Sequence, residues 1–198
     1  SGMGGLASAT NTSEARFLMK KYFKGNVDFR LGKEIELYQQ KQDELLRRLD
    51  KHPNTQGALD LGLAGEWNGL RGLRERAEKK QVRGAWISYH PQLVDDDAPE
   101  IIEELRRLVA ALEFSVVSTT HQFEWAAKAS ALLPMAAWSE ELGTYTNYAG
   151  RVQITNRAVM PPGEAHPLHL LMAELLLTML PHATTRRRGR RRRPSRGG

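Results

Sequence analysis

The chain has no cysteine among its 198 residues. Disulfides, thiolate catalysis, cysteine-ligated zinc and conventional iron–sulfur clusters are therefore excluded as products of this chain alone. The chain also lacks a long apolar run, because Leu168–Leu180 is interrupted by His169 and Glu174 and falls short of the roughly 20 residues that a bilayer span needs. No transmembrane segment is expected. No charged-then-apolar leader follows Met3, which predicts a cytoplasmic location, with the inner membrane reached only through partners.

Positive charge is concentrated at one end of the sequence. Eight arginines lie in the last thirteen residues, and removing these eight charges from the net +6 leaves −2. Low-complexity arginine predicts a disordered tail over 184–198 that nucleic acid, an acidic protein or an anionic membrane would attract. A solvated extension of little function fits the composition equally, and the tail has no aromatic residue for reading RNA bases. The arginines are Arg186, Arg187, Arg188, Arg190, Arg191, Arg192, Arg193 and Arg196.

The remaining composition, with 40% hydrophobic residues, suits one ordinary globular domain, which we place at 13–183. Residues 1–12 are small and polar without apolar periodicity, so they are expected to be disordered. Ser13 as N-cap and Gly25 as terminator bound a predicted helix over 13–24.

The next segments are predicted to be helical on either side of a glycine-containing loop. Apolar spacing favours helices over 33–49 and 66–80. Between them, residues 54–62 hold two glycines five apart among small residues. Such a pattern indicates a backbone that approaches another group closely.

The second half of the chain reads as alternating strands and helices. Gly84–Tyr89, a helix over 98–112 and Phe114–Ser118 form a strand–helix–strand unit, and a helix over 122–130 leads to another short strand, Ala131–Met135. Short apolar strands separated by amphipathic helices are typical of parallel βαβ units. The predicted fold class is therefore α/β, a doubly wound and mainly parallel sheet flanked by helices.

A polar, glycine-bounded segment follows. It covers residues 143–153. It overlaps the alternating stretch Val152–Thr155, which predicts an edge strand. Further along, Pro161-Pro162-Gly163 interrupts the chain before a last predicted helix. Ligands of open α/β sheets bind at the carboxyl ends of strands, so the loops after Tyr89, Ser118 and Met135 are candidate ligand sites.

Five segments in order resemble the large subunit of the molybdopterin oxidoreductase superfamily, the branch that includes the large iron–sulfur subunit of NADH-quinone oxidoreductase. The most specific is Gly143-Thr144-Tyr145-Thr146-Asn147-Tyr148-Ala149-Gly150-Arg151-Val152-Gln153, after Leu132-Leu133-Pro134, Trp138 and Glu140 or Glu141. The others are Asn54–Gly62, Gly84-Ala85-Trp86-Ile87, Pro161-Pro162-Gly163-Glu164-Ala165, and the upstream stretch from Asn11 to Asp28. Together they cover roughly residues 10–180, the C-terminal portion of such a subunit.

The resemblance implies a domain that, in members with molybdenum or tungsten, helps to hold a molybdopterin guanine dinucleotide. In the NADH dehydrogenase subunit the resemblance implies that the same domain serves largely as a scaffold, while the iron–sulfur clusters are bound by other parts of the subunit. Ser130, Leu142 and Ala149 stand where the family usually has acidic residues, and the cluster-binding and pterin-capping domains are missing. Little activity of the chain alone is therefore expected.

Candidate cofactor contacts follow from the resemblance. Arg151 could donate two parallel hydrogen bonds to pyrophosphate oxygens, and the glycines would allow the backbone to approach the cofactor closely. The alternative is that Asn147 and Arg151 only brace a long connection. The candidates are Gln56, Gly57, Asp60, Thr144, Thr146, Asn147, Gly150 and Arg151.

Histidines offer weaker candidates for chemistry. His121 could act as a general base after its strand, but no serine or carboxylate is placed convincingly beside it. His166 and His169, with His182 beyond them, hint at a metal but more often lie on a helix surface. No catalytic or metal site is therefore assigned.

Three functions remain open on the sequence. The first is a scaffold portion of an NADH dehydrogenase- or molybdopterin-oxidoreductase-type electron-transfer complex, with iron–sulfur subunits or domains as partners and no cofactor bound by this chain alone. The second is half of a molybdopterin guanine dinucleotide site in a formate dehydrogenase-like enzyme, completed by the missing domains. The third is a nucleic-acid-binding module acting through Arg186–Arg196.

Overall fold

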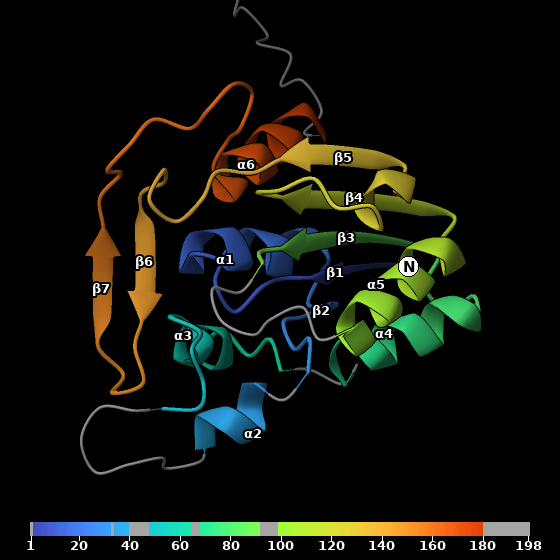
Figure 1. The fold of residues 1–198 in the computed structure, drawn as a ribbon, viewed down its shortest axis with the longest axis horizontal. Helices are drawn as coiled ribbons and strands as arrows, with labels where there is room; N and C mark the ends of the chain where they lie inside the picture. Colours follow the sequence, from blue (N-terminus) through green and yellow to red (C-terminus); the bar gives the residue numbers. More distant parts are fainter. Residues whose placement is uncertain (1, 33, 40–47, 65–67, 92–98, 180–198) are drawn as a thin grey trace, which may run out of the picture.

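The computed structural model describes residues 2–32, 34–39, 48–64, 68–91 and 99–179. Its centre is a five-stranded, all-parallel sheet in the order β2-β1-β3-β4-β5 (Figure 1). The strands are β1 (Met3–Leu6), β2 (Val27–Asp28), β3 (Gly84–Tyr89), β4 (Phe114–Thr119) and β5 (Ala131–Pro134). The predicted α/β class with a mainly parallel sheet is confirmed.

Helices cover both faces of this sheet. They are α1 (Ser13–Tyr22), α2 (Glu34–Gln39), α3 (Thr55–Asp60), α4 (Gly69–Glu78), α5 (Pro99–Ala111) and α6 (Leu168–Met179), with a 3-10 turn, η1, at Ala126–Lys128. None of the helices within the described residues is long and apolar enough to cross a membrane.

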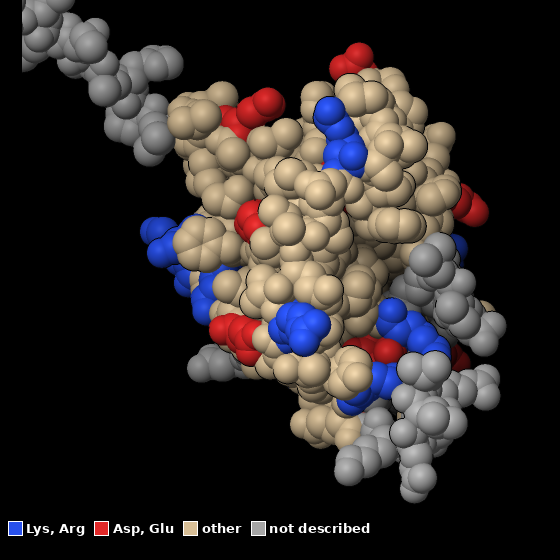
Figure 2. All heavy atoms as spheres, turned by 90° about the vertical axis from the view of Figure 1, so that its left-hand side faces the viewer, with Lys and Arg blue, Asp and Glu red and all other residues tan. Residues whose placement is uncertain are grey.

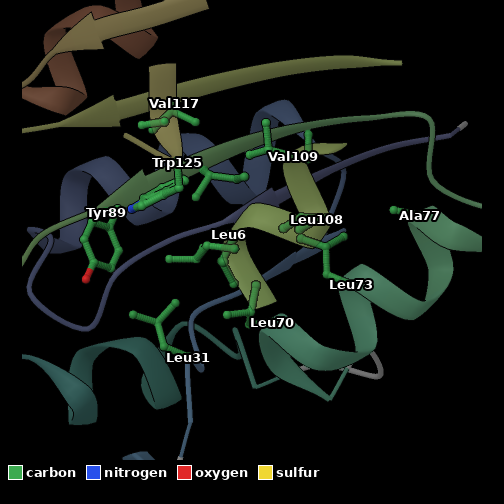
Figure 3. Packing of buried hydrophobic residues seen from close by; sticks show 14 of the residues in the cluster. Leu6, Leu31, Leu70, Leu73, Ala77, Tyr89, Leu108, Val109, Val117 and Trp125 are labelled. Atoms are coloured by element: carbon green, nitrogen blue, oxygen red, sulfur yellow. The ribbon is translucent and has the colours of Figure 1, made fainter. Parts of the chain in front are cut away.

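The two faces have separate hydrophobic cores because strand side chains alternate between them. On one face Leu6, Ile87 and Val117 pack with α4 and α5 residues such as Leu73 and Leu108 (Figure 3). On the other face Trp86 packs with residues of α1, α3 and α6, among them Met19, Ala58 and Met172. The sheet is therefore doubly wound.

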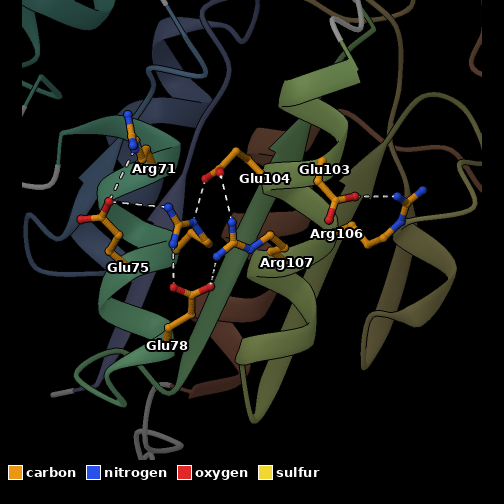
Figure 4. Close-up of polar contacts among 8 residues, drawn as sticks. Arg71, Glu75, Glu78, Glu103, Glu104, Arg106 and Arg107 are labelled. Carbon is orange, nitrogen blue, oxygen red and sulfur yellow. Dashed lines mark hydrogen bonds and ion pairs between the residues drawn. The ribbon is translucent and has the colours of Figure 1, made fainter.

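An ionic network joins α4 and α5 at the surface (Figure 4). The Arg74 guanidinium contacts Glu78 at 2.6 Å and Glu104 at 2.8 Å, and Arg107 contacts Glu78 at 2.8 Å. Arg74 is only 8% exposed, so its carboxylate partners offset the loss of hydration.

The prediction that residues 1–12 are disordered is wrong where the structure describes them. Met3–Leu6 forms β1, which pairs with β2 on one side and β3 on the other, and Leu6 is fully buried. The small residue at position 5 is required by packing, because a Cβ on Gly5 would lie 2.8 Å from the Phe23 ring. The strand shows no apolar alternation because one side of it must admit an aromatic side chain.

Several element boundaries also differ from prediction. Thr12, not Ser13, caps α1, accepting a hydrogen bond from the Ala15 amide at 3.3 Å. The helix predicted over 122–130 is reduced to η1, because Phe123 and Trp125 stack with each other and contact the Tyr89 ring edge-on. Residues 40–47 of the helix predicted over 33–49, and the tail predicted over 184–198, lie outside the described residues.

The segment 143–153 lies outside the main sheet. It builds a separate antiparallel hairpin of β6 (Gly143–Thr146) and β7 (Val152–Thr155). Val152–Thr155 is an edge strand as predicted, but its sheet has two strands only. Figure 1 shows the hairpin beside the carboxyl ends of the main strands, next to α1 and α3.

Candidate functional site

Asn54 connects two of the five segments that carry the family resemblance, 54–62 and 143–153. Its side-chain Oδ1 accepts a hydrogen bond from the Thr146 amide at 2.7 Å, and its Nδ2 donates to the Thr144 carbonyl at 3.4 Å and to the Asn11 carbonyl at 2.9 Å. The carboxamide thus takes the place of a third strand along the outer edge of β6. The segments 54–62 and 143–153, both of which carry the family resemblance, thus lie side by side and are joined by the Asn54 side chain.

Close packing explains the glycine at the start of α3. A Cβ on Gly57 would lie 2.1 Å from Asn54 Oδ1 and 3.3 Å from Ser13 Oγ. The predicted close approach of this backbone is confirmed, although 54–62 contains the short helix α3 rather than an open loop. The group that this backbone approaches is the Asn54 side chain, which hydrogen-bonds to the edge of β6.

The N-terminus of α1 holds the other end of β6. Glu14 accepts hydrogen bonds from the Thr144 amide at 2.9 Å and from the Thr144 hydroxyl at 2.8 Å. A Cβ on Gly143 would meet Thr12 Cγ2 at 2.3 Å, so the strand and the helix are in direct contact. Both outward-facing amides of β6 are therefore satisfied by side chains.

A cavity of about 150 Å³ lies between α3 and the hairpin. His52 Nδ1 lies 2.5 Å from Asp50 Oδ1. Burial, the largest single cause, acts to raise the pKa of Asp50, but the hydrogen bonds and charge of its neighbours, led by His52, lower it overall. Arg48 stacks on the ring of Tyr148 at 3.8 Å. The lining residues are Tyr38, Arg48, Asp50, His52, Pro53, Thr55, Gln56, Thr146, Asn147 and Tyr148.

Three of the eight candidate cofactor contacts line this cavity, namely Gln56, Thr146 and Asn147. Gln56 accepts a hydrogen bond from the Tyr38 hydroxyl and donates to Asp60 at 2.6 Å.

Asn147 and its neighbours build the hairpin turn. The Asn147 side-chain oxygen accepts hydrogen bonds from the amides of Ala149 and Arg151, both at 3.0 Å. Gly150 has φ +74°, a conformation that favours glycine. Arg151 is exposed, and within the described residues its guanidinium has no partner. Gly57, Asp60, Thr144, Gly150 and Arg151 do not line the cavity.

Sequence reasoning missed Arg16, a fully buried arginine on α1. Its Nε donates to the Ser8 carbonyl at 3.0 Å and its Nη1 to the Asn54 carbonyl at 2.6 Å, while its Nη2 has no partner among the described residues. Burial lowers the pKa of Arg16 to about 9, which leaves it cationic at neutral pH. No sequence signal marks it, because a lone arginine in a helix is usually solvated.

A buried titratable cluster lies beneath the hairpin. Burial raises the pKa of Glu141 to about 7, and a hydrogen bond from Tyr145 at 3.5 Å opposes this. His169 Nδ1 is 3.9 Å from Glu141 Oε2, and burial lowers the pKa of His169. Because both pKa values move toward the neutral forms, we treat this contact as a neutral pair rather than as an ion pair.

Within the described residues, His121 and His166 have no catalytic or metal-ligating partners. His121 is exposed and contacts the Thr120 hydroxyl at 2.9 Å. His166 pairs through its backbone with Met135, and His182 lies outside the described residues. In the part of the chain that is described, no three histidine, aspartate or glutamate side chains gather as a metal site.

Comparison with known proteins shows the family of this chain. The family model of molybdopterin oxidoreductase matches residues 6–176, most of the sequence. The chain therefore belongs to the molybdopterin oxidoreductase family.

Individual relatives lie in several branches. The chain is 27% identical over 175 residues to the mitochondrial NADH-ubiquinone oxidoreductase 78 kDa subunit of Candida albicans, covering 79% of this chain and 23% of that protein. It is 36% identical over 86 residues to the F420-dependent formate dehydrogenase subunit alpha of Methanocaldococcus jannaschii, covering 43% and 12%. It is 33% identical over 110 residues to a nitrate reductase of Synechocystis, covering 55% and 14%. The chain thus spans less than a quarter of the length of each.

The cavity does not fit a complete pterin dinucleotide. Its volume of about 150 Å³ is below the roughly 300–1,000 Å³ of pockets that enclose drug-sized ligands. Asn147 and Gln56, the most suitable polar groups, already hydrogen-bond within the chain. This cavity alone therefore cannot enclose the cofactor. A second, more apolar hollow of about 460 Å³ on the hairpin shares Pro53 and Asn147 with its lining.

Proposed function

We propose that this chain is a scaffold segment of the large subunit in an NADH dehydrogenase- or molybdopterin-oxidoreductase-type electron-transfer complex. Iron–sulfur subunits or domains would be its partners, because the chain itself has no cysteine to ligate a cluster. A cytoplasmic location, peripheral to the inner membrane through those partners, is part of the same proposal.

One observation carries the proposal: polar groups of the segments 54–62 and 143–153 are used in hydrogen bonds within the chain. Asn54 satisfies the outer edge of β6, and Asn147 satisfies the amides of the hairpin turn. Thr144 is held by Glu14. Groups used in this way position the hairpin and are not free to meet a ligand, which supports the scaffold function over the cofactor site.

The competing function is half of a molybdopterin guanine dinucleotide site, completed by other domains. The similarity to formate dehydrogenase subunits favours considering it. Arg151 is the candidate contact best able to serve it, because its guanidinium is exposed and could form a fork to a pyrophosphate.

Equilibrium dialysis of the chain against molybdopterin guanine dinucleotide tests whether its own residues hold the cofactor. The scaffold function predicts no saturable uptake at cofactor concentrations up to about 100 μM, which corresponds to less than roughly 5.5 kcal/mol of binding free energy. Saturable binding would contradict the scaffold function. If Arg151→Ala abolished that binding and the control Arg157→Ala, at a neighbouring exposed residue, left it intact, the cofactor site would be the better interpretation.

The scaffold function also predicts that Asn54→Ala lowers stability. The Asn54→Ala substitution leaves the buried Thr146 amide unpaired, which should lower the free energy of unfolding by about 1–3 kcal/mol. The Arg151→Ala substitution should change that free energy by less than about 0.5 kcal/mol. Urea unfolding monitored by circular dichroism measures both. An Asn54→Ala variant as stable as the parent would argue against a structural role for this junction.

A further inference from the structure

The two edges of the β6–β7 hairpin differ in what they meet. The outer edge of β6 is satisfied, because the Thr144 amide donates to Glu14 and the Thr146 amide to Asn54. β7 is the outermost strand on the left of Figure 1, and no described strand pairs with its other side. Among the strands that the structure describes, one edge of this small sheet is therefore unpaired.

The pairing register identifies the backbone groups of the open edge. Thr144 lies opposite Ile154, and Thr146 lies opposite Val152. Because the amides of both threonines point away from β7, these are the non-hydrogen-bonded pairs of the ladder. The N–H and C=O groups of Val152 and Ile154 consequently point outward, away from β6.

The side chains of this edge are apolar and exposed. Val152 and Ile154 are each 64% exposed, and being two residues apart they lie on the same face. β7 has no charged residue, no proline and a regular register, so three of the usual protections of an edge strand are missing. Figure 2 shows that the middle of the face carrying the hairpin is largely without charged side chains.

We propose that β7 pairs antiparallel with β7 of a second copy of this chain, across a twofold axis beside Gln153. Val152 then lies opposite Ile154 of the second copy, and each such pair exchanges two N–H···O bonds, about four in all. The two hairpins become one four-stranded sheet. On one face of it, the aliphatic side chains of each copy cover those of the other.

The charges of the flanking residues favour a second copy in this register. Arg151 lies opposite Thr155 of the second copy, and Arg157 lies beyond the end of the paired strands. No like charges face each other, so the pairing avoids the repulsion that opposed like charges cause across strands.

The contact is small, which sets its expected strength. One short strand and its apolar neighbours bury less than about 1,200 Å² in total, the class of weak and transient interfaces. The expected dissociation constant is about 10–100 μM. Sedimentation velocity on the full chain between about 5 and 300 μM should show a monomer–dimer equilibrium.

A cysteine cross-link tests the register, because the chain has no cysteine of its own. The two copies of residue 153 face each other as a non-hydrogen-bonded pair with Cα atoms about 4.5 Å apart, within disulfide range. Gln153→Cys should therefore form an intermolecular disulfide under mild oxidation. Arg151→Cys is the matched control, since its two copies lie about 13 Å apart and cannot be bridged.

Charge placed on the edge tests the surface. Ile154→Lys should raise the dissociation constant at least tenfold, while Val159→Lys, which changes a residue outside β7 that is 53% exposed, should leave it unchanged. The proposal is overturned by a monomer throughout the range, by equal cross-linking of the two cysteine variants, or by equal weakening in the two lysine variants.

Discussion

At the scale of single residues, Glu141 and His90 are buried groups whose charged forms the fold disfavours. Burial raises the pKa of Glu141 to about 7 and lowers the pKa of His90 to about 4, and nearby His121 and Arg16 contribute to the shift of His90. Their ordinary values are 4.5 and 6.5. The two groups therefore act on stability in opposite directions as pH changes.

The signs follow from proton uptake. Between pH 4.5 and 7 the unfolded chain ionises Glu141 while the folded chain keeps it protonated, so stability falls as pH rises. Between pH 6.5 and 4 the unfolded chain protonates His90 while the folded chain does not, so stability falls as pH falls. Each contribution is about 3 kcal/mol when complete. In the window that they share, the two slopes largely cancel.

Glu141→Gln should remove one side of this balance. The amide keeps a hydrogen-bond acceptor for Tyr145 without a charge to bury, so the variant is expected to be about 2–3 kcal/mol more stable than the parent at pH 8 and about equal to it at pH 4.5. Urea unfolding at the two pH values measures the difference. The same change in stability at both values would mean that ionisation of Glu141 is not involved.

At the scale of elements, the ionic network between α4 and α5 should contribute measurably through one residue. Arg74→Ala leaves Glu104, which is 26% exposed, without the guanidinium that contacts it at 2.8 Å, and the expected loss is about 1–3 kcal/mol. Arg71→Ala is the control, because Arg71 is 76% exposed and contacts Glu75 at 3.5 Å. It should change stability by less than about 0.5 kcal/mol.

Thermal unfolding of the two variants provides the comparison. The loss in Arg74→Ala should be smaller at 1 M NaCl, where the Debye length is about 3 Å, because the partners of Arg74 are partly exposed. Equal losses in the two variants would show that the arginine near the core is no more important than the exposed one.

Elements with strong periodicity could be predicted from the sequence, and short ones that depend on tertiary packing could not. β3 and α5 combine continuous apolar character or a clear amphipathic face with sufficient length. β1 has four residues, two of them glycine, and its conformation depends on pairing with strands distant in the chain. The turn of η1 follows from aromatic contacts that local propensity does not describe.

The candidate site shows the same division. The resemblance included the segments 54–62 and 143–153, and three of the candidate residues in them, Gln56, Thr146 and Asn147, line one cavity. Asn54 and Arg16, which connect those segments, could not be singled out, because their roles depend on burial and on partners far away in sequence. A polar residue becomes structural only when the fold removes its water.

At the scale of the whole molecule, charge divides the chain into two parts with different expected partners. The domain belongs to an oxidoreductase family, whereas the arginine run over 186–196, outside the described residues, would attract phosphates whatever the domain does. Changing the net charge from +6 to −2 by removing residues 184–198 should therefore separate the two behaviours.

Deleting residues 184–198 is expected to abolish retention of RNA or DNA at about 50 mM salt, and the full chain should lose most of its retention by about 200 mM as released counterions weaken the contact. Filter binding over this salt range measures both. A second variant that replaces the eight arginines with glutamine keeps the length and should behave like the deletion. Undiminished retention in either variant would place nucleic-acid binding on the domain instead, and the tail would then have no part in it.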